Sequence, residues 1–286
     1  FLLSGCNAPA INTPLPSESA TGSAPTEVPA TPTPTSAPHA LVVNGEGILL
    51  SEYEAEIFRL QSALSQLGKE MSPEEQKDQV MNSFIDQLLM AQAAARAGFS
   101  VSDDALQQRI DELIQELESP EKLSEWQTAN GYTEDTFRVA LKREMAVAWQ
   151  RDAITNAVPT TAEQIHARQL FFKNEANAIA AQKKLESGID FSTLAEEQDA
   201  TLGGDLGWFP RGMLTQLEVE EAVFAMQPGE TSGIIASSLG YHIVNILERE
   251  NDHPLSTEAR LMLQEKALQD WLTAEREKST IEILVP

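Results

Sequence analysis

The sequence predicts an α+β protein in which a helical part, a mixed helix and strand part, and a final helix follow one another along the chain. Three observations lead to this prediction. Stretches with one apolar helical face fill residues 40–158, alternating strand patterns appear within 160–250, and one amphipathic stretch occupies most of 255–286. Residues 7–39 are rich in Pro, Thr, Ser and Ala and contain few large apolar side chains, so a disordered tether is expected there.

The charge balance excludes several classes of protein. The 286 residues include 20 Lys plus Arg and 44 Asp plus Glu, which gives a formal net charge of −24. Nucleic-acid binding and docking on anionic lipid both need a basic surface, so neither partner is expected. The one cysteine, Cys6, rules out an intrachain disulfide, and four scattered histidines do not supply a zinc site. The sequence contains no run of about 18 apolar residues, so no membrane-spanning helix is expected.

Residues 1–6 form a short apolar stretch that ends in the one cysteine. Because residue 1 is not Met, the stretch is interpreted as the remnant of a signal peptide. Leu3-Ser4-Gly5-Cys6 resembles the bacterial lipobox. That resemblance implies cleavage before Cys6 and a diacylglycerol on its thiol, which would hold the protein to the membrane of the cell envelope on the extracytoplasmic side. The alternative is a cysteine without a role near an apolar start.

Residues 40–158 are predicted to be helical after one short strand. Ala40 to Glu46 forms that strand and ends in an Asn-Gly turn. Ser51 is expected to cap the first helix, with Glu54 completing a capping box. Later helices are expected to start at Ser72-Pro73, at Ser102, at Leu123 and at Thr133, and Pro159 marks the boundary. The carboxylates lie at helix starts and on solvated faces, so no acid–base role is expected for them.

Residues 160–250 mix strands and helices. A strand is expected from Ala167 to Phe171, helices from Glu175 to Ser187 and from Asp190 onwards, and strands over Ser232–Ala236 and Tyr241–Leu247. Gly203, Gly204 and Gly207 allow a tight loop with positive φ. Alternation along the last strand places His242, Val244 and Ile246 on one face.

Five motifs of this segment resemble a parvulin-type (PpiC, rotamase) peptidyl-prolyl cis/trans isomerase domain. They are Ala167-Arg168-Gln169-Leu170-Phe171, the run from Gly203 to Phe209, Glu221 to Met226, Pro228-Gly229-Glu230, and Gly240 to Val244. The pieces of 40–158, from Val-Asn-Gly-Glu to Asn-Gly-Tyr-Thr-Glu, are similar to the N-terminal chaperone domain of SurA-like and PrsA-like foldases. The resemblance implies a four-stranded antiparallel sheet with surrounding helices, and a C-terminal helix (255–286) that returns to the chaperone domain. A swapped dimer is the alternative for that helix, so monomer and dimer both stay open.

The resemblance also implies a set of site residues. The family has two histidines beneath a proline pocket, and His242 matches the second of them. Gln169 stands where the first is expected, and His166, three residues earlier, falls on the opposite face of the strand and does not replace it. Asp199 is the match for an acidic residue near the amide.

The expected apolar wall of the pocket departs from the family in one place. Leu214, or Met213, fits the position of a Met or Leu, whereas Val219 occupies the position of a ring-facing Phe. Trp208 and Phe209 are expected to be core or pocket wall.

Isomerisation of an X-Pro bond crosses a rotation barrier of about 18–20 kcal/mol and breaks no bond to carbon, so neither a metal nor a cofactor is required. The resemblance therefore implies a membrane-anchored foldase that isomerises X-Pro bonds of unfolded or secreted polypeptides and also holds such chains. Gln169 and Val219 motivate the alternative of a holdase without catalysis. A solute-binding lipoprotein would need repeated βαβ units, and the sequence contains no such pattern.

Overall fold

The computed structural model describes residues 37–285, so the predictions for residues 1–6, for Cys6 and for most of the tether lie outside the described residues. The described chain opens with a hairpin of β1 (His39–Val43) and β2 (Glu46–Leu49). Asn44 and Gly45 form its turn, both with positive φ, in agreement with the Asn-Gly prediction. His39 thus belongs to a strand rather than to the tether.

Five helices follow the hairpin and build the helical part. They are α1 (Leu50–Leu67), α2 (Pro73–Arg96), α3 (Asp103–Leu117), α4 (Pro120–Ala129) and α5 (Glu134–Asn156). Ser72, Ser102 and Thr133 cap α2, α3 and α5 through their side chains, so these three predicted starts are confirmed.

Two predicted helix starts in this part are wrong. Ser51 does not cap α1: the helix begins at Leu50, directly after β2, and its first turn has no side-chain cap. The strand leads straight into the helix, because the Leu50 N–H is already satisfied by the carbonyl of Pro38 at 2.8 Å. α4 begins at Pro120 rather than at Leu123, because Ser119 accepts hydrogen bonds from the backbone of Glu121 and Lys122.

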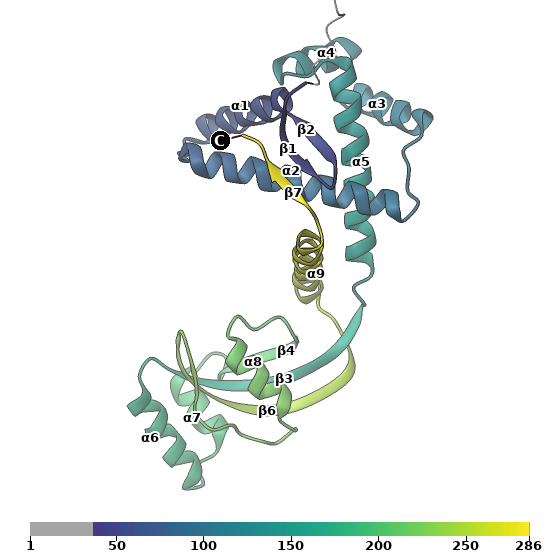
Figure 1. The fold of residues 1–286 in the computed structure, drawn as a ribbon. Helices are drawn as coiled ribbons and strands as arrows, with labels where there is room; N and C mark the ends of the chain where they lie inside the picture. Colours follow the sequence, from purple (N-terminus) through teal and green to yellow (C-terminus); the bar gives the residue numbers. More distant parts are fainter. Residues whose placement is uncertain (1–36, 286) are drawn as a thin grey trace, which may run out of the picture. The chain divides into compact units, whose positions relative to one another are not determined.

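The C-terminal segment completes this same part. α9 (Thr257–Glu277) contacts α5 and α2, and β7 (Ile281–Ile283) pairs antiparallel with β1, giving a sheet in the order β2-β1-β7. Figure 1 shows β7, at the yellow end of the chain, lying beside β1 at the purple end. The prediction that the C-terminal helix returns to the N-terminal helical part is therefore confirmed.

Two polar residues, Asn44 and Arg276, connect the C-terminal segment to the hairpin and to α2. The Asn44 side chain donates to Gln92 at 2.9 Å and accepts from the Thr280 backbone at 2.9 Å. At the end of α9, Arg276 pairs with Asp86 of α2 at 2.6 Å. Beneath them, a buried cluster from β1, β2 and α2 is covered by Ile281 of β7. Burial of that apolar surface supplies most of the stabilisation, since exposed ion pairs contribute little.

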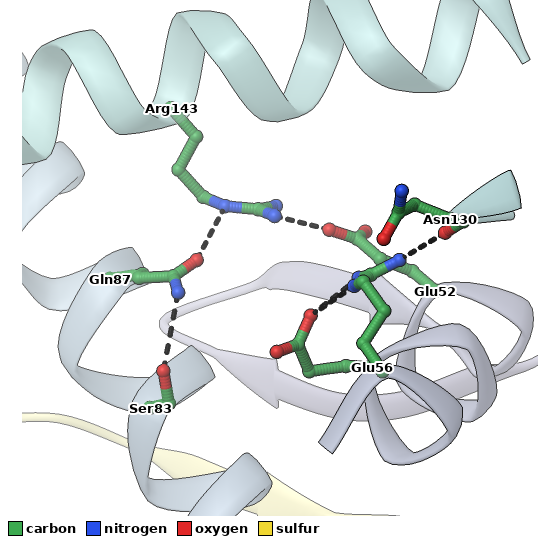
Figure 2. A network of polar contacts seen from close by, with 7 residues as sticks. Glu52, Glu56, Ser83, Gln87, Asn130 and Arg143 are labelled. Atoms are coloured by element: carbon green, nitrogen blue, oxygen red, sulfur yellow. Dashed lines mark hydrogen bonds and ion pairs between the residues drawn. The ribbon is translucent and has the colours of Figure 1, made fainter. Parts of the chain in front are cut away.

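A second network joins α1, α2 and α5 (Figure 2). Arg143 of α5 donates to Gln87 of α2 at 3.2 Å and forms an ion pair with Glu52 of α1. Arg59 of α1 pairs with Glu56 and donates to the carbonyl of Asn130 at 2.5 Å. Arg59 thereby holds the turn between α4 and α5 against α1, and Arg143 joins α5 to α1 and α2.

The segment Thr161–Pro254 forms the sheet part. Its strands are β3 (Thr161–Phe172), β4 (Asp205–Pro210), β5 (Ile235–Ser237) and β6 (Gly240–Pro254), and its helices are α6 (Glu175–Glu186), α7 (Phe191–Gln198) and α8 (Leu217–Ala225). The strands form an antiparallel sheet in the order β4-β3-β6-β5, which confirms the expected four-stranded architecture. β5 is shorter and later than the expected strand at Ser232–Ala236. The Ser232 N–H donates to the Val244 carbonyl at 2.8 Å, but the Val244 N–H donates back to the Ser232 hydroxyl at 2.9 Å and not to a backbone carbonyl, so the chain forms only an isolated bridge there.

Both faces of this sheet are buried. On one face, Val244, Ile246, Ile165 and Ala167 pack with Phe209 and with α8. On the other, Leu170 and Ile243 pack with α6 and α7. Successive side chains of β6 therefore alternate between two separate cores, as the pleat of a strand requires.

Candidate active site

The strands β3, β5 and β6 bring three polar side chains to one face of the sheet. His242 lies at the start of β6, Gln169 near the end of β3, and Ser237 at the end of β5. Antiparallel pairing sets Gln169 opposite Val244 and Phe171 opposite His242. The alternation of the strand then places Gln169 and His242 on the same face, which is the face of Val244.

A chain of hydrogen bonds runs through His242. Its Nδ1 lies 3.2 Å from Oε1 of Gln169, and its Nε2 lies 2.8 Å from Oγ of Ser237. An amide oxygen only accepts, so Nδ1 carries the proton, and in the neutral ring Nε2 is then free to accept from the Ser237 hydroxyl. The Leu239 N–H in turn donates to Ser237 Oγ at 3.2 Å. The contact with Gln169 therefore selects the neutral tautomer that carries its proton on Nδ1.

The position of His242 favours the uncharged ring. Its side chain is only 3% exposed, and this burial lowers its pKa below the usual value, with a smaller opposing effect from Glu218. The ring of Phe171 lies 5.1 Å from that of His242 and adds apolar surroundings. Burial therefore favours the neutral form of the imidazole.

The backbone of Gln169 packs against the loop that contains Gly203 and Gly204. Its N–H donates to the Gly204 carbonyl at 2.8 Å, and a Cβ at Gly204 would lie 2.2 Å from the Gln169 carbonyl oxygen. Gly204 has a φ of +67°, so only glycine fits both the space and the conformation.

Asp199 lies in the same loop, at the end of α7. Its carboxylate accepts from the backbone of Thr201 at 3.0 Å and of Leu202 at 3.2 Å, and its carbonyl accepts from Gly203 at 2.8 Å. Asp199 therefore shapes the loop that holds Gln169, and its side chain is already engaged by backbone donors.

The structure separates the two aromatic residues of β4. Phe209 is buried in the same cluster as Val219, whereas Trp208 points to the other face, where its ring stacks on His253 at 4.0 Å. His166 lies on that second face as well, with Nε2 at 2.9 Å from Asp205. The pleat accounts for both placements, and it agrees with the expectation that His166 does not stand in for the first family histidine.

Of the residues expected in the apolar wall, Met213 and Leu214 are partly buried against the cluster around Phe209. Val219 is 3% exposed and thus lies in the core of this cluster. The segment that carries Met213 and Leu214 is fixed by Glu220, which accepts from the N–H groups of Gly212 at 2.8 Å and Leu214 at 3.2 Å.

Sequence reasoning missed Ser237 and Glu220. Ser237 touches His242 only because the tight turn after β5 sets a register in which Ser237 faces Gly240, and the sequence around it does not specify that register. Glu220 is buried although it is charged, and nothing in its neighbourhood of acidic residues distinguishes it from exposed glutamates.

Within residues 37–285, no group of three or more histidine, cysteine or acidic side chains is placed to hold a metal ion. In the same range, no helix is both long and apolar enough to cross a bilayer. The candidate site thus consists of the hydrogen-bonded chain through His242, the loop behind Gln169 and the adjoining apolar cluster.

Two family models match the chain. A model described as a SurA-like N-terminal domain matches residues 28–150, and the model of the PPIC-type PPIASE domain matches residues 143–248. The second match contains Gln169, Ser237 and His242. The two matches overlap slightly and together extend over the helical part and most of the sheet part.

Several proteins of known name are similar to this chain. Chaperone SurA of Thiobacillus denitrificans is 32% identical over 141 residues, which cover 42% of this chain and 32% of that protein. Chaperone SurA of Hahella chejuensis is 26% identical over 277 residues, covering 82% and 63%. Foldase protein PrsA of Geobacillus kaustophilus is 27% identical over 185 residues, covering 62% and 65%.

The chain thus spans between about a third and two thirds of the length of these relatives. The order of its two matched domains is the one that the motifs at residues 40–158 and 160–250 predict. The chain therefore combines a match to a SurA-like N-terminal domain with a match to a PPIC-type domain, and it is similar to proteins named Chaperone SurA and Foldase protein PrsA.

Proposed function

We propose that this protein is a foldase that isomerises X-Pro bonds of unfolded exported polypeptides through its parvulin-type domain and holds such chains through its helical part. The observation that supports catalysis most strongly is the neutral His242, hydrogen-bonded to Ser237 and Gln169 within the PPIC-type match. The family resemblance supports the class of reaction.

The chemistry asks little of the side chains beyond shape and polarity. In the twisted transition state the amide loses resonance, its carbonyl oxygen carries less charge and its nitrogen becomes more pyramidal. A site that binds the proline ring against apolar side chains and offers no full charge favours the twisted amide over the planar one. A neutral His242, buried and held on both ring nitrogens, fits that requirement because it adds a fixed dipole without a charge.

The roles of the other residues follow from their contacts. Gln169 accepts from Nδ1 of His242, which a neutral histidine at that position would also do through its free nitrogen. Asp199 acts through the loop behind Gln169, so we assign it a positioning role rather than contact with substrate. Met213 and Leu214 are the candidates for contact with the proline ring.

The test is exchange spectroscopy by NMR on a short X-Pro peptide. His242→Ala is expected to lower kcat/KM about tenfold, equivalent to ~1.4 kcal/mol of transition-state stabilisation. His166→Ala, on the other face of the sheet, is the matched control and should leave the rate unchanged. If the parent protein shows no exchange above the uncatalysed rate, the alternative of a holdase without isomerase activity is the better description.

We also propose that the protein is a lipoprotein of the cell envelope, anchored through Cys6 and facing the extracytoplasmic side. Leu3-Ser4-Gly5-Cys6 and the Pro- and Thr-rich residues that follow support this proposal. In a precursor with its natural leader, Cys6→Ser should move the protein from the membrane fraction to the soluble one. Retention of the variant in the membrane fraction would refute the anchor and leave the isomerase proposal untouched.

A further inference from the structure

An apolar groove lies among α3, α4 and α5 of the helical part, away from the candidate active site in the sequence and on other elements. Its volume is about 380 Å³. Leu113 and Leu117 of α3, Trp126 of α4 and Leu141 of α5 are among the residues that line it. Ligand pockets of proteins occupy roughly 300–1,000 Å³, so the groove is large enough for one or two apolar side chains of a polypeptide.

Aromatic rings form one wall of this groove. The Trp126 ring stacks on Tyr132 at 6.0 Å, and Tyr132 meets Phe137 edge to face at 5.8 Å. Trp126 remains 45% exposed, although it is a large apolar side chain. An exposed ring that already has aromatic neighbours on one side presents its other surface to an incoming apolar group.

The wall is held in place from behind. The guanidinium of Arg59 lies 4.6 Å from the centre of the Tyr132 ring and donates to the Asn130 carbonyl in the turn before it. This is the network of Figure 2, in which Glu56 orients Arg59 and Arg143 ties α5 to α1. A groove supported in this way exists before a ligand arrives, so binding does not have to order its walls.

The helices beside the groove carry an excess of acidic residues. Residues 109–125, which span most of α3 and the start of α4, include two basic residues, Arg109 and Lys122, and six acidic residues: Asp111, Glu112, Glu116, Glu118, Glu121 and Glu125. Arg109 pairs with Glu112 at 3.0 Å and with Glu116 at 3.4 Å, and Lys122 pairs with Glu118 at 3.3 Å, so an excess of four negative charges remains. Glu116 lines the groove itself, and Glu118 has a side chain that is 81% exposed. This acidic rim therefore favours a ligand with positive charges beside its apolar anchor.

Charge also decides among the possible occupants. The chain's own residues 1–37 contain two glutamates and no Lys or Arg, so they do not complement the rim. A second copy of this chain would bring a net charge of −24 and repel it. We propose that the groove binds unfolded polypeptide segments in which an aromatic or aliphatic anchor is flanked by Lys or Arg, a proposal that rests on the holding function proposed above.

The test uses the full chain and two labelled peptides without proline. Both peptides have a Leu-Phe-Leu centre, and one is flanked by lysines and the other by glutamates. Fluorescence anisotropy at low salt should give a Kd about tenfold lower for the lysine peptide, and this preference should shrink in 0.5 M salt, about where screening becomes strong.

Variants locate the binding site. Glu116→Lys together with Glu125→Lys should raise the Kd of the lysine peptide about tenfold. Asp78→Lys together with Glu265→Lys, both exposed and outside the groove, changes the net charge equally and should alter the Kd less than about twofold, since distant surface charges are screened. Trp126→Ala should weaken both peptides, with its melting temperature measured to verify folding.

The proposal is overturned if the two charge-reversal pairs act alike, or if a folded Trp126→Ala protein binds both peptides as the parent does. Aggregation of an unfolded client and X-Pro exchange are measured on the same preparations. If the parent protein suppresses aggregation and the groove variants do so equally well, the groove is the wrong site while the holding function stands. Loss of isomerase activity alone leaves the groove assignment intact.

Discussion

The helical part and the sheet part differ in how the chain completes them. The sheet part is one continuous segment, Thr161–Pro254, and every strand pairs with another strand of that segment. The helical part is discontinuous: β1 near the start of the described chain pairs with β7 at its end, and α9 packs on α5 and α2. One part is therefore built from a single stretch of chain, whereas the other is assembled from both ends of the described chain.

Removal of residues 257–286 is expected to have the largest effect. β1 would lose its partner β7, and the cluster around β1 and α2 would lose the cover of Ile281 and Val285. The free energy of unfolding of a domain is about 5–15 kcal/mol, so the loss of a whole helix and strand should unfold the helical part. Two-dimensional NMR should show the sheet part still dispersed. Unchanged resonances from α1 and α2 would contradict the discontinuous assembly.

Gly204→Ala should destabilise the sheet part next most strongly. The added Cβ would lie 2.2 Å from the Gln169 carbonyl oxygen, at a φ of +67°. Gly203→Ala is the matched control: its φ is +59°, but the nearest atom, Cγ of Glu196, is 3.6 Å away. We expect roughly 1–3 kcal/mol from the backbone conformation in both variants and a further loss in Gly204→Ala alone. Equal melting temperatures for the two variants would show that the loop does not press on Gln169.

Val219→Phe should lower the melting temperature without a gain in isomerisation rate. The sequence places Val219 where the family has a ring-facing Phe, which predicts up to tenfold higher kcat/KM for the variant. The 3% exposure of Val219 instead predicts overpacking at a cost of about 1–3 kcal/mol. Leu217→Phe, on the exposed side of the same helix, is the control and should be neutral. If the Val219→Phe protein isomerises faster and is equally stable, Val219 lines the proline pocket and is not a core residue.

The smallest expected effect is a loss of stability of the sheet part at acidic pH. Burial lowers the pKa of His242, so the unfolded chain takes up its proton at a higher pH than the folded chain. The sheet part therefore loses stability as the pH falls below about 6.5, the value of a free imidazole, and this loss is complete once the folded pKa is passed. His242→Gln should remove that dependence. Melting curves at pH 7.5 to 5 measure it, and an unchanged slope in the variant would assign the dependence to another group.

Local signals in the sequence predict much of this fold. Ser72, Ser102 and Thr133 mark helix starts because an oxygen at the N-cap position satisfies free backbone N–H groups whatever the tertiary surroundings. Ser51 shows the limit of the same rule. A strand runs directly into α1, so the helix starts one residue before Ser51 and the capping pattern is not used.

The candidate site is less accessible to sequence reasoning than the fold. Alternation along β6 places His242 and Val244 on one face, and the structure has them there. The contact of His242 with Ser237 depends on the register of the short hairpin between β5 and β6. The burial of Val219 depends on how α8 packs on the sheet. Both are consequences of packing between distant segments, which spacing in the sequence does not encode.

The pairing of β1 with β7 also affects the order in which the two parts can fold during synthesis. Val43 and Ile281, which pair, are separated by nearly the whole described chain. A chain that appears N-terminus first can therefore finish its middle segment before its beginning. Once Thr161 and Pro254 are paired, the loop that remains to be closed is shorter, which lowers the entropic cost by only roughly 0.4 kcal/mol. The larger consequence concerns the time of synthesis. Until residues 281–283 have been made, β1 and α2 expose the apolar surface that β7 later covers, so the incomplete chain itself needs protection from aggregation.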